Sequence, residues 1–168
     1  MTMRTAKELV LCALLGAILH AAKFAISFLP NIEPVTLLLA VYVLTMGLKR
    51  SLWATAVFVM LEGLLYGFGL WFWCYCYVWP LWVLAVWLLR KNTSRVLWAV
   101  AAGAYGMSFG ALMAVPYLAI GGPAMLASVW ISGIPWDVAH CAGNFVLALL
   151  LLPVLCKAFA DIGRRAAL

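Results

Sequence analysis

Ionisable side chains are scarce in this chain, and those that interrupt apolar stretches are its best candidates for chemistry. Moving a charged group into the hydrocarbon core of a membrane costs about 2.5 to 3.5 kcal/mol on insertion scales, so each such group needs a partner or a function. Carboxylates, imidazoles and an ammonium group can either bind a ligand or satisfy one another across helices. Residues of this kind are His20, Lys23, Glu33, Glu62, Asp137 and His140.

The spacing of these residues predicts that several share a helix face. Asp137, His140 and Asn144 follow an i, i+3, i+7 pattern, which makes one polar stripe about two turns long. Glu62 and Tyr66 are likewise four residues apart. For any single residue, internal pairing and ligand binding remain equally open. For the whole set we favour a ligand site, because three acids, a lysine and two histidines exceed what structural pairing requires.

Aromatic residues give a second signal of a ligand site. They crowd residues 71–82, and two more Trp residues flank the start of the last apolar stretch. An interfacial aromatic belt accounts for part of this density, but flat aromatic walls with a few polar groups also suit a heterocyclic ligand. The predicted substrate-binding residues are Lys23, Glu33, Glu62, Tyr66, Trp71, Trp73, Trp136, Asp137, His140 and Asn144.

Membrane helices must position these side chains. Of 168 residues, 68% are hydrophobic and 10% are charged, whereas a soluble domain keeps about a quarter charged. Residues 121–133 are expected to form an irregular apolar connection between the last two spans. We predict an all-α membrane protein, residues 1–168 forming a single six-helix bundle with spans at about 6–28, 34–48, 52–68, 74–89, 96–120 and 134–156.

The distribution of basic residues predicts the orientation of the bundle. Lys and Arg precede the first span, separate the second from the third and the fourth from the fifth, and follow the sixth. Only Lys23 departs from this pattern. By the positive-inside rule both termini are cytoplasmic, and the ionisable residues listed above fall in the extracellular half. The net charge of +6 is therefore a topology signal, and no nucleic-acid partner is expected.

The sequence lacks the motifs of several other common activities. No P-loop, GxSxG or HExxH pattern occurs, so the chain cannot hydrolyse ATP itself. A metal could use Glu62, Asp137 and His140, but no tight ligand motif supports such a site. The five cysteines are dispersed and are expected to be small buried hydrophobic residues. We expect neither a cofactor nor a metal.

Small residues recur every four positions in the first span. Ala13, Ala17, Ala21 and Ala25 form a ridge that would let another helix approach closely, since packing drives helix association in lipid. The ridge fits either packing inside the bundle or docking of an external partner.

Together these features resemble the substrate-binding S component of an energy-coupling-factor (ECF) transporter, a vitamin-uptake member of the ABC superfamily. The resemblance rests on size, six spans, the alanine ridge and the segments 29–36 (LPNIEPVT) and 133–144 (GIPWDVAHCAGN). It implies that the ridge docks on a membrane T component, that outer loops gate a site near the extracellular face, and that two separate ABC ATPases supply energy. It further implies toppling of the S component to deliver a micronutrient, without catalysis, in a prokaryotic cytoplasmic membrane.

Two other functions have some support in the sequence. A small intramembrane hydrolase could use Asp137 and His140 as acid and base, but no nucleophile is evident. An ion or proton channel could be gated by Lys23 and Glu62, but the cytoplasmic halves of the middle spans offer almost no polar residues. For a binding protein, the excess of acids over lysine favours a neutral or cationic nitrogen heterocycle over a multiply anionic compound.

Overall fold

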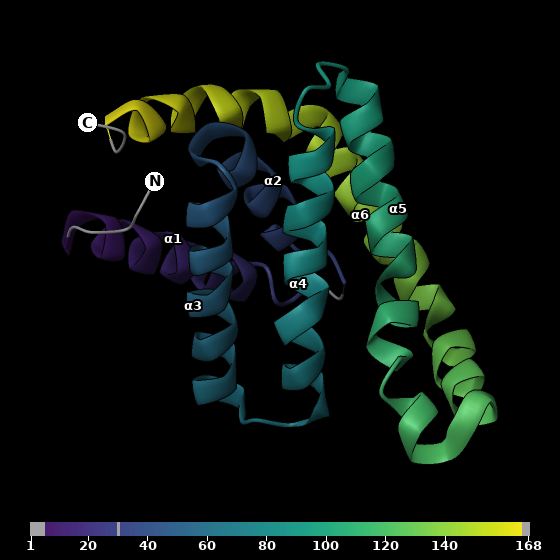
Figure 1. The fold of residues 1–168 in the computed structure, drawn as a ribbon. Helices are drawn as coiled ribbons and strands as arrows, with labels where there is room; N and C mark the ends of the chain where they lie inside the picture. Colours follow the sequence, from purple (N-terminus) through teal and green to yellow (C-terminus); the bar gives the residue numbers. More distant parts are fainter. Residues whose placement is uncertain (1–5, 30, 166–168) are drawn as a thin grey trace.

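The computed structural model describes residues 6–29 and 31–165, the last three without their side chains. Within these residues every regular element is an α-helix (Figure 1). Arg4, one of the basic residues before the first predicted span, and Pro30, in the segment 29–36, lie outside the described residues. The helices are α1 (Ala6–Ala25), α2 (Val35–Met46), α3 (Leu48–Tyr66), α4 (Leu70–Leu89), α5 (Arg95–Ala114) and α6 (Tyr117–Arg165).

Helix α1 crosses α3 at a steep angle and packs closely against it (Figure 1). At the crossing, a Cβ on Gly16 would lie 2.6 Å from the Val57 side chain and 2.9 Å from the Ala54 carbonyl oxygen. Only a residue without a side chain permits this approach. Nearer the start of α1, Arg50 at the start of α3 donates to both carboxylate oxygens of Glu8, at 3.0 and 2.5 Å. This ion pair holds the beginning of α1 against the beginning of α3.

Helix α2 forms the centre of the bundle. Ten of its twelve residues are buried, because its apolar side chains point in all directions and neighbouring helices surround it. It connects to α3 through Gly47 alone, whose φ of +84° is accessible to glycine at little cost. Lys49 and Arg50, predicted to lie in a loop between two spans, therefore fall in the first turn of α3.

Helices α5 and α6 pack tightly side by side through glycines of α5. A Cβ on Gly106 would lie 2.8 Å from the backbone carbonyl of His140, and a Cβ on Gly110 would lie 2.3 Å from the Asp137 carboxylate. The small residues of α5 thus set how closely α6 can bring its polar stripe to the rest of the bundle.

The close contact at Gly106 predicts a destabilising substitution. Gly106→Ala should lower the free energy of unfolding by about 1 to 3 kcal/mol, because the added methyl group meets backbone atoms that cannot rotate away. The matched control is Gly133→Ala in α6, where no atom lies within 4 Å of the new Cβ. It should be neutral or stabilising by up to about 1 kcal/mol, as expected for Gly→Ala in a helix. Denaturant titration of both variants in detergent measures the difference, and equal stabilities would contradict the packing described.

The sequence prediction for residues 121–133 was wrong. This segment is helical apart from a kink at Gly121 and Gly122, and helix α6 continues through Gly133 and Pro135. Pro123 directly follows the kink, where a missing N–H costs little. Single glycine and proline residues are tolerated in helices in apolar surroundings, because the peptide groups find no hydrogen-bond partners outside the helix there.

Other helix bounds differ by a few residues from those predicted. Helix α1 ends at Ala25 and α5 at Ala114, both earlier than expected, whereas α4 begins at Leu70, before the expected Cys74. The turn between α3 and α4 is correspondingly confined to 67–69, with Gly67 at a φ of +87°.

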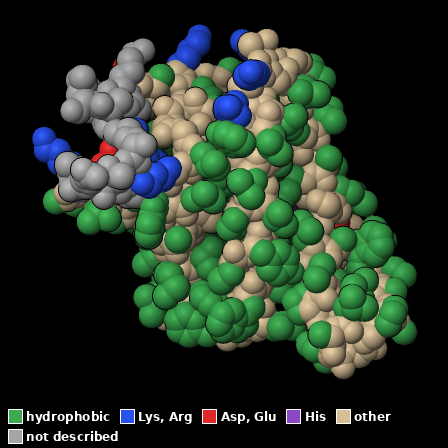
Figure 2. All heavy atoms as spheres, in the orientation of Figure 1, with side chains coloured by type: hydrophobic (Ala, Val, Ile, Leu, Met, Phe, Trp, Pro, Cys, Tyr) green, Lys and Arg blue, Asp and Glu red, His purple; other side chains and the backbone are tan. Residues whose placement is uncertain are grey.

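Four helices, α1, α4, α5 and α6, are long and apolar enough to cross a membrane. Helix α2, at twelve residues, spans only about 18 Å at the usual rise per residue, and α3 carries two basic residues in its first turn. In Figure 2, Lys and Arg side chains gather near one end of the visible face, and most of the remaining side chains are hydrophobic. The described helices are thus compatible with a membrane protein.

Candidate functional site

A cavity of about 210 Å³ lies where α1, α4, α5, α6 and the segment before α2 meet. The connection between α1 and α2 closes part of it through Ser27, Leu29, Asn31 and Ile32. Charged, imidazole and aromatic side chains form the remaining wall: Lys23, Glu33, Tyr75, Trp79, Phe109 and His140.

The first polar group at this cavity is a buried cluster centred on Glu62. Its carboxylate is 1% exposed, and it pairs with Lys23 Nζ through one oxygen and with His20 Nδ1, at 2.7 Å, through the other. Lys23 also lies 5.3 Å from the centre of the Tyr75 ring and 5.9 Å from that of Tyr66. Lys23 therefore reaches the cavity wall with its charge already compensated from α3.

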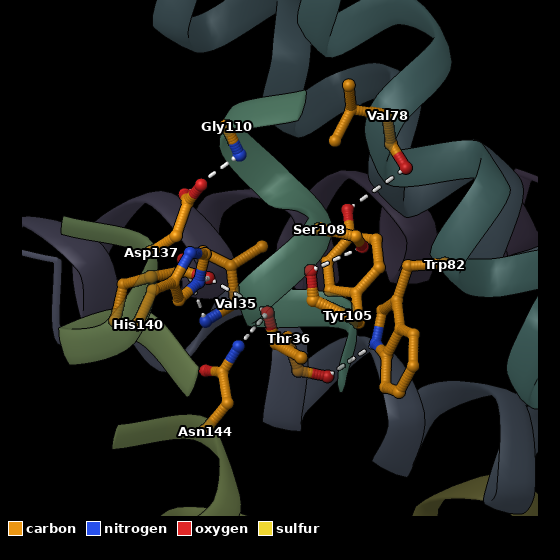
Figure 3. Close-up of polar contacts among 11 residues, drawn as sticks. Val35, Thr36, Val78, Trp82, Tyr105, Ser108, Gly110, Asp137, His140 and Asn144 are labelled. Atoms are coloured by element: carbon orange, nitrogen blue, oxygen red, sulfur yellow. Dashed lines mark hydrogen bonds and ion pairs between the residues drawn. The ribbon is translucent and has the colours of Figure 1, made fainter. Parts of the chain in front are cut away.

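The second polar group joins the start of α2 to α6. Glu33 accepts hydrogen bonds from the Val35 N–H at 3.2 Å and the Thr36 hydroxyl at 3.0 Å, and it lies 3.3 Å from His140 Nε2. Asn144 donates to the Thr36 hydroxyl oxygen at 3.2 Å (Figure 3). The carboxylate thus caps a helix N-terminus, where a negative charge is favourable, and also holds the imidazole of α6.

An aromatic cluster forms the opposing wall. Trp79 packs edge-on against Tyr75 with ring centres 5.5 Å apart, and Phe109 lies 5.3 Å from Trp79 and 4.9 Å from the His140 ring. Trp71 extends the cluster, packing edge-on on Tyr75 at 5.3 Å. These rings offer flat apolar faces beside the charged pairs, which is the composition typical of small-molecule sites.

Three buried side-chain nitrogen or oxygen atoms of the described residues lack a hydrogen-bond partner: Trp79 Nε1, Asp137 Oδ2 and Asn144 Oδ1. Asp137 directs its other oxygen to the Gly110 N–H at 2.9 Å, and Figure 3 shows it on the far side of His140 from Thr36 and Asn144. Only Trp79 of the three lines the cavity.

The structure separates the residues predicted for substrate binding into three groups. Lys23, Glu33 and His140 line the cavity. A second group lies one contact away from the cavity. Glu62 and Tyr66 lie next to Lys23, and Trp71 packs on Tyr75. Asn144 bonds to Thr36, which in turn donates to Glu33. Trp73 and Trp136 are 62% and 54% exposed and do not line the cavity, and Asp137 bonds to α5 instead.

The cavity is also lined by three aromatic residues that the sequence did not predict as site residues: Tyr75, Trp79 and Phe109. A signal existed for the first two, which are four residues apart in the aromatic-rich stretch and so share a face of α4. Phe109 also follows Tyr105 by four residues in α5. One such pair in an apolar helix is too common to indicate a site.

The alanine ridge of α1 faces away from the bundle. Ala13, Ala17, Ala21 and Ala25 are all exposed, whereas Gly16 on the same helix is buried against α3. Large apolar residues flank the ridge, including Leu14 and Ile18 at 57% and 42% exposure. The ridge is therefore not used for packing within the described part of this chain.

Comparison with known proteins does not assign the chain to a family. No family model, curated protein or solved structure matches the chain. Within residues 6–29 and 31–165 no group of three or more His, Cys, Asp or Glu side chains is placed to hold a metal ion.

Proposed function

We propose that this protein is the substrate-binding S component of an ECF-type importer, and that the cavity captures a vitamin or related heterocyclic micronutrient from outside the cell. The observation that carries the proposal is the division of α1 into two faces. Lys23 on one face lines the cavity, and the four alanines occupy an exposed face of the same helix. A binding site and a docking ridge on one helix are what a ligand-delivering subunit requires.

The proposed bundle has six spans with both termini cytoplasmic. In this proposal α2 and α3 also span the membrane, in addition to the four long apolar helices. Helix α2 is then a short span that its neighbours bury. The basic residues at one end of Figure 2 support this orientation, because positive charge stays on the cytoplasmic side. The cavity then opens toward the extracellular side.

Energy is supplied in this proposal by other subunits. The ridge docks on a membrane T component through close helix contact, and two ABC ATPases attached to that component drive release of the ligand to the cytoplasm. A cell membrane of a prokaryote is the expected location.

The arrangement of polar groups supports binding over conduction. Helix α2 follows the cavity-lining Glu33, and its buried residues from Leu37 to Val43 are all nonpolar except for Tyr42, whose hydroxyl donates to the Leu15 carbonyl. Conduction needs polar groups at every depth. This nonpolar stretch of α2 supports a binding pocket rather than a polar path through the protein.

Native mass spectrometry of protein purified from rich medium tests the proposal. The wild-type protein should retain one unmodified small molecule, because a nanomolar complex, about −12 kcal/mol, survives purification. Ile32→Trp, which places an indole ring at the cavity wall, should remove at least nine-tenths of that adduct. The matched control Val100→Trp lies on a half-exposed face of α5 and should retain it. A wild-type protein that retains nothing, or an adduct that is unchanged in Ile32→Trp, would contradict the proposed binding function.

A further inference from the structure

Two buried Trp residues of α4 differ in how their indole N–H groups are satisfied. Trp82 Nε1 donates to the Thr36 carbonyl oxygen at 2.8 Å and is part of the internal network (Figure 3). Trp79, 1% exposed and lining the cavity, has no acceptor for its N–H among the described residues. A buried donor without an acceptor carries its full desolvation cost, so it gains the most from a ligand that supplies one.

The size of the cavity restricts what can supply that acceptor. Sites for drug-sized ligands enclose about 300 to 1,000 Å³, and the cavity of about 210 Å³ falls below that range. Its Tyr75, Trp79 and Phe109 rings favour a flat aromatic partner through offset or edge-to-face contacts. One or two fused rings fit, whereas a macrocycle does not.

The charges on the wall restrict the ligand further. Lys23 is the cation of the described wall, and it is already paired with Glu62. Glu33 is held by the Thr36 hydroxyl, the Val35 N–H and His140. A phosphate group would have to draw Lys23 away from Glu62, leaving a buried carboxylate without its cation, and would lie in the same cavity as the Glu33 carboxylate.

From these observations we infer that the ligand is a flat nitrogen heterocycle of one or two rings without phosphate, with a ring nitrogen that accepts the Trp79 indole N–H. The inference rests on the proposed function in taking this cavity as the capture site. Trp79 is then a specificity-determining residue that selects for an acceptor atom, and Trp82 serves the fold.

Benzimidazole and indole are the probes that test this inference. They share one two-ring skeleton, but benzimidazole has an acceptor nitrogen where indole has a C–H group. On ligand-free wild-type protein in detergent at neutral pH, isothermal titration should show benzimidazole binding about tenfold more tightly than indole, the effect of one net hydrogen bond. In Trp79→Phe the preference should fall to less than twofold, since the N–H is gone and the ring remains.

Trp82→Phe is the matched control, with a similar loss of buried volume. It should keep the tenfold preference and lower the melting temperature more than Trp79→Phe does, because it leaves the Thr36 carbonyl without its donor. As a test of charge, adenine should displace benzimidazole from wild-type protein, and adenosine monophosphate should not.

Failure of this inference and failure of the proposed function give different results. Equal affinities of the wild-type protein for both probes, a preference that persists in Trp79→Phe, or displacement by adenosine monophosphate would overturn the ligand class. The wild-type comparison depends on no variant folding. If the probes behave as expected but the protein never associates with a T component and ATPases in membranes, the ligand class stands and the transporter assignment fails.

Discussion

Ala17→Trp should reduce ATP-driven uptake of the retained ligand to background while leaving the affinity of the purified protein for that ligand within twofold of wild type. The indole ring would stand on the exposed ridge of α1 and prevent another helix from approaching it. The cavity lies on the other face of the helix, where Lys23 lines its wall. Uptake assays in cells and titrations in detergent measure the two effects on the same variant.

Co-purification with the T component and the ATPases should fall in parallel with uptake. Val100→Trp serves as the control for a bulky residue on a half-exposed apolar helix face, and it should leave uptake and co-purification unchanged. If Ala17→Trp lost ligand affinity together with uptake, the ridge would belong to the packing that forms the cavity. If uptake persisted, docking would have to use another surface.

Glu62→Gln should lower the free energy of unfolding by about 3 kcal/mol. Removing one member of a buried ion pair costs about 3 to 5 kcal/mol because its partner stays uncompensated, and the 29% exposure of the Lys23 side chain places the cost at the lower end. Lys23→Met combined with Glu62→Gln should restore most of the loss, since neither charge is then buried alone. Denaturant titration of the two single variants and the double variant measures this coupling.

Tyr66→Phe is the control, because it keeps the ring beside Lys23 and alters an exposed hydroxyl, so its effect should stay within about 0.5 kcal/mol. The sequence predicts Glu62 as a ligand-binding residue, and in the structure Glu62 pairs with Lys23 without itself lining the cavity. A Glu62→Gln variant with unchanged stability and a tenfold or greater loss of ligand affinity would show that the carboxylate contacts the ligand after all.

Several features of this protein could be predicted from local sequence alone. The excess of apolar residues implies helices, because only intrahelical hydrogen bonds satisfy the backbone within a single apolar segment. The four-residue spacing of the alanines places them on one face of α1. Lys23, Glu33 and His140 could be singled out because an ionisable group is conspicuous in an apolar stretch.

The break predicted at residues 121–133 shows where local signals mislead. Glycine and proline favour turns in water, where exposed peptide groups find other partners. In the structure the helix continues through Gly133 and Pro135 and bends only at Gly121 and Gly122. Such continuity is what apolar surroundings favour, because there the peptide groups have no hydrogen-bond partners outside the helix.

Tertiary structure decided which polar groups meet and which faces stay open. Periodicity assigns residues to a face of their own helix, but neighbours on another helix depend on where the two cross. The contact of Gly16 with α3 brings Lys23 to Glu62, and the contact of Gly106 with α6 brings His140 toward Phe109. The packing of α6 against α2 brings His140 to Glu33. The same crossings leave the alanine ridge uncovered and the Trp79 N–H without an acceptor, because both outcomes depend on packing between segments far apart in the chain.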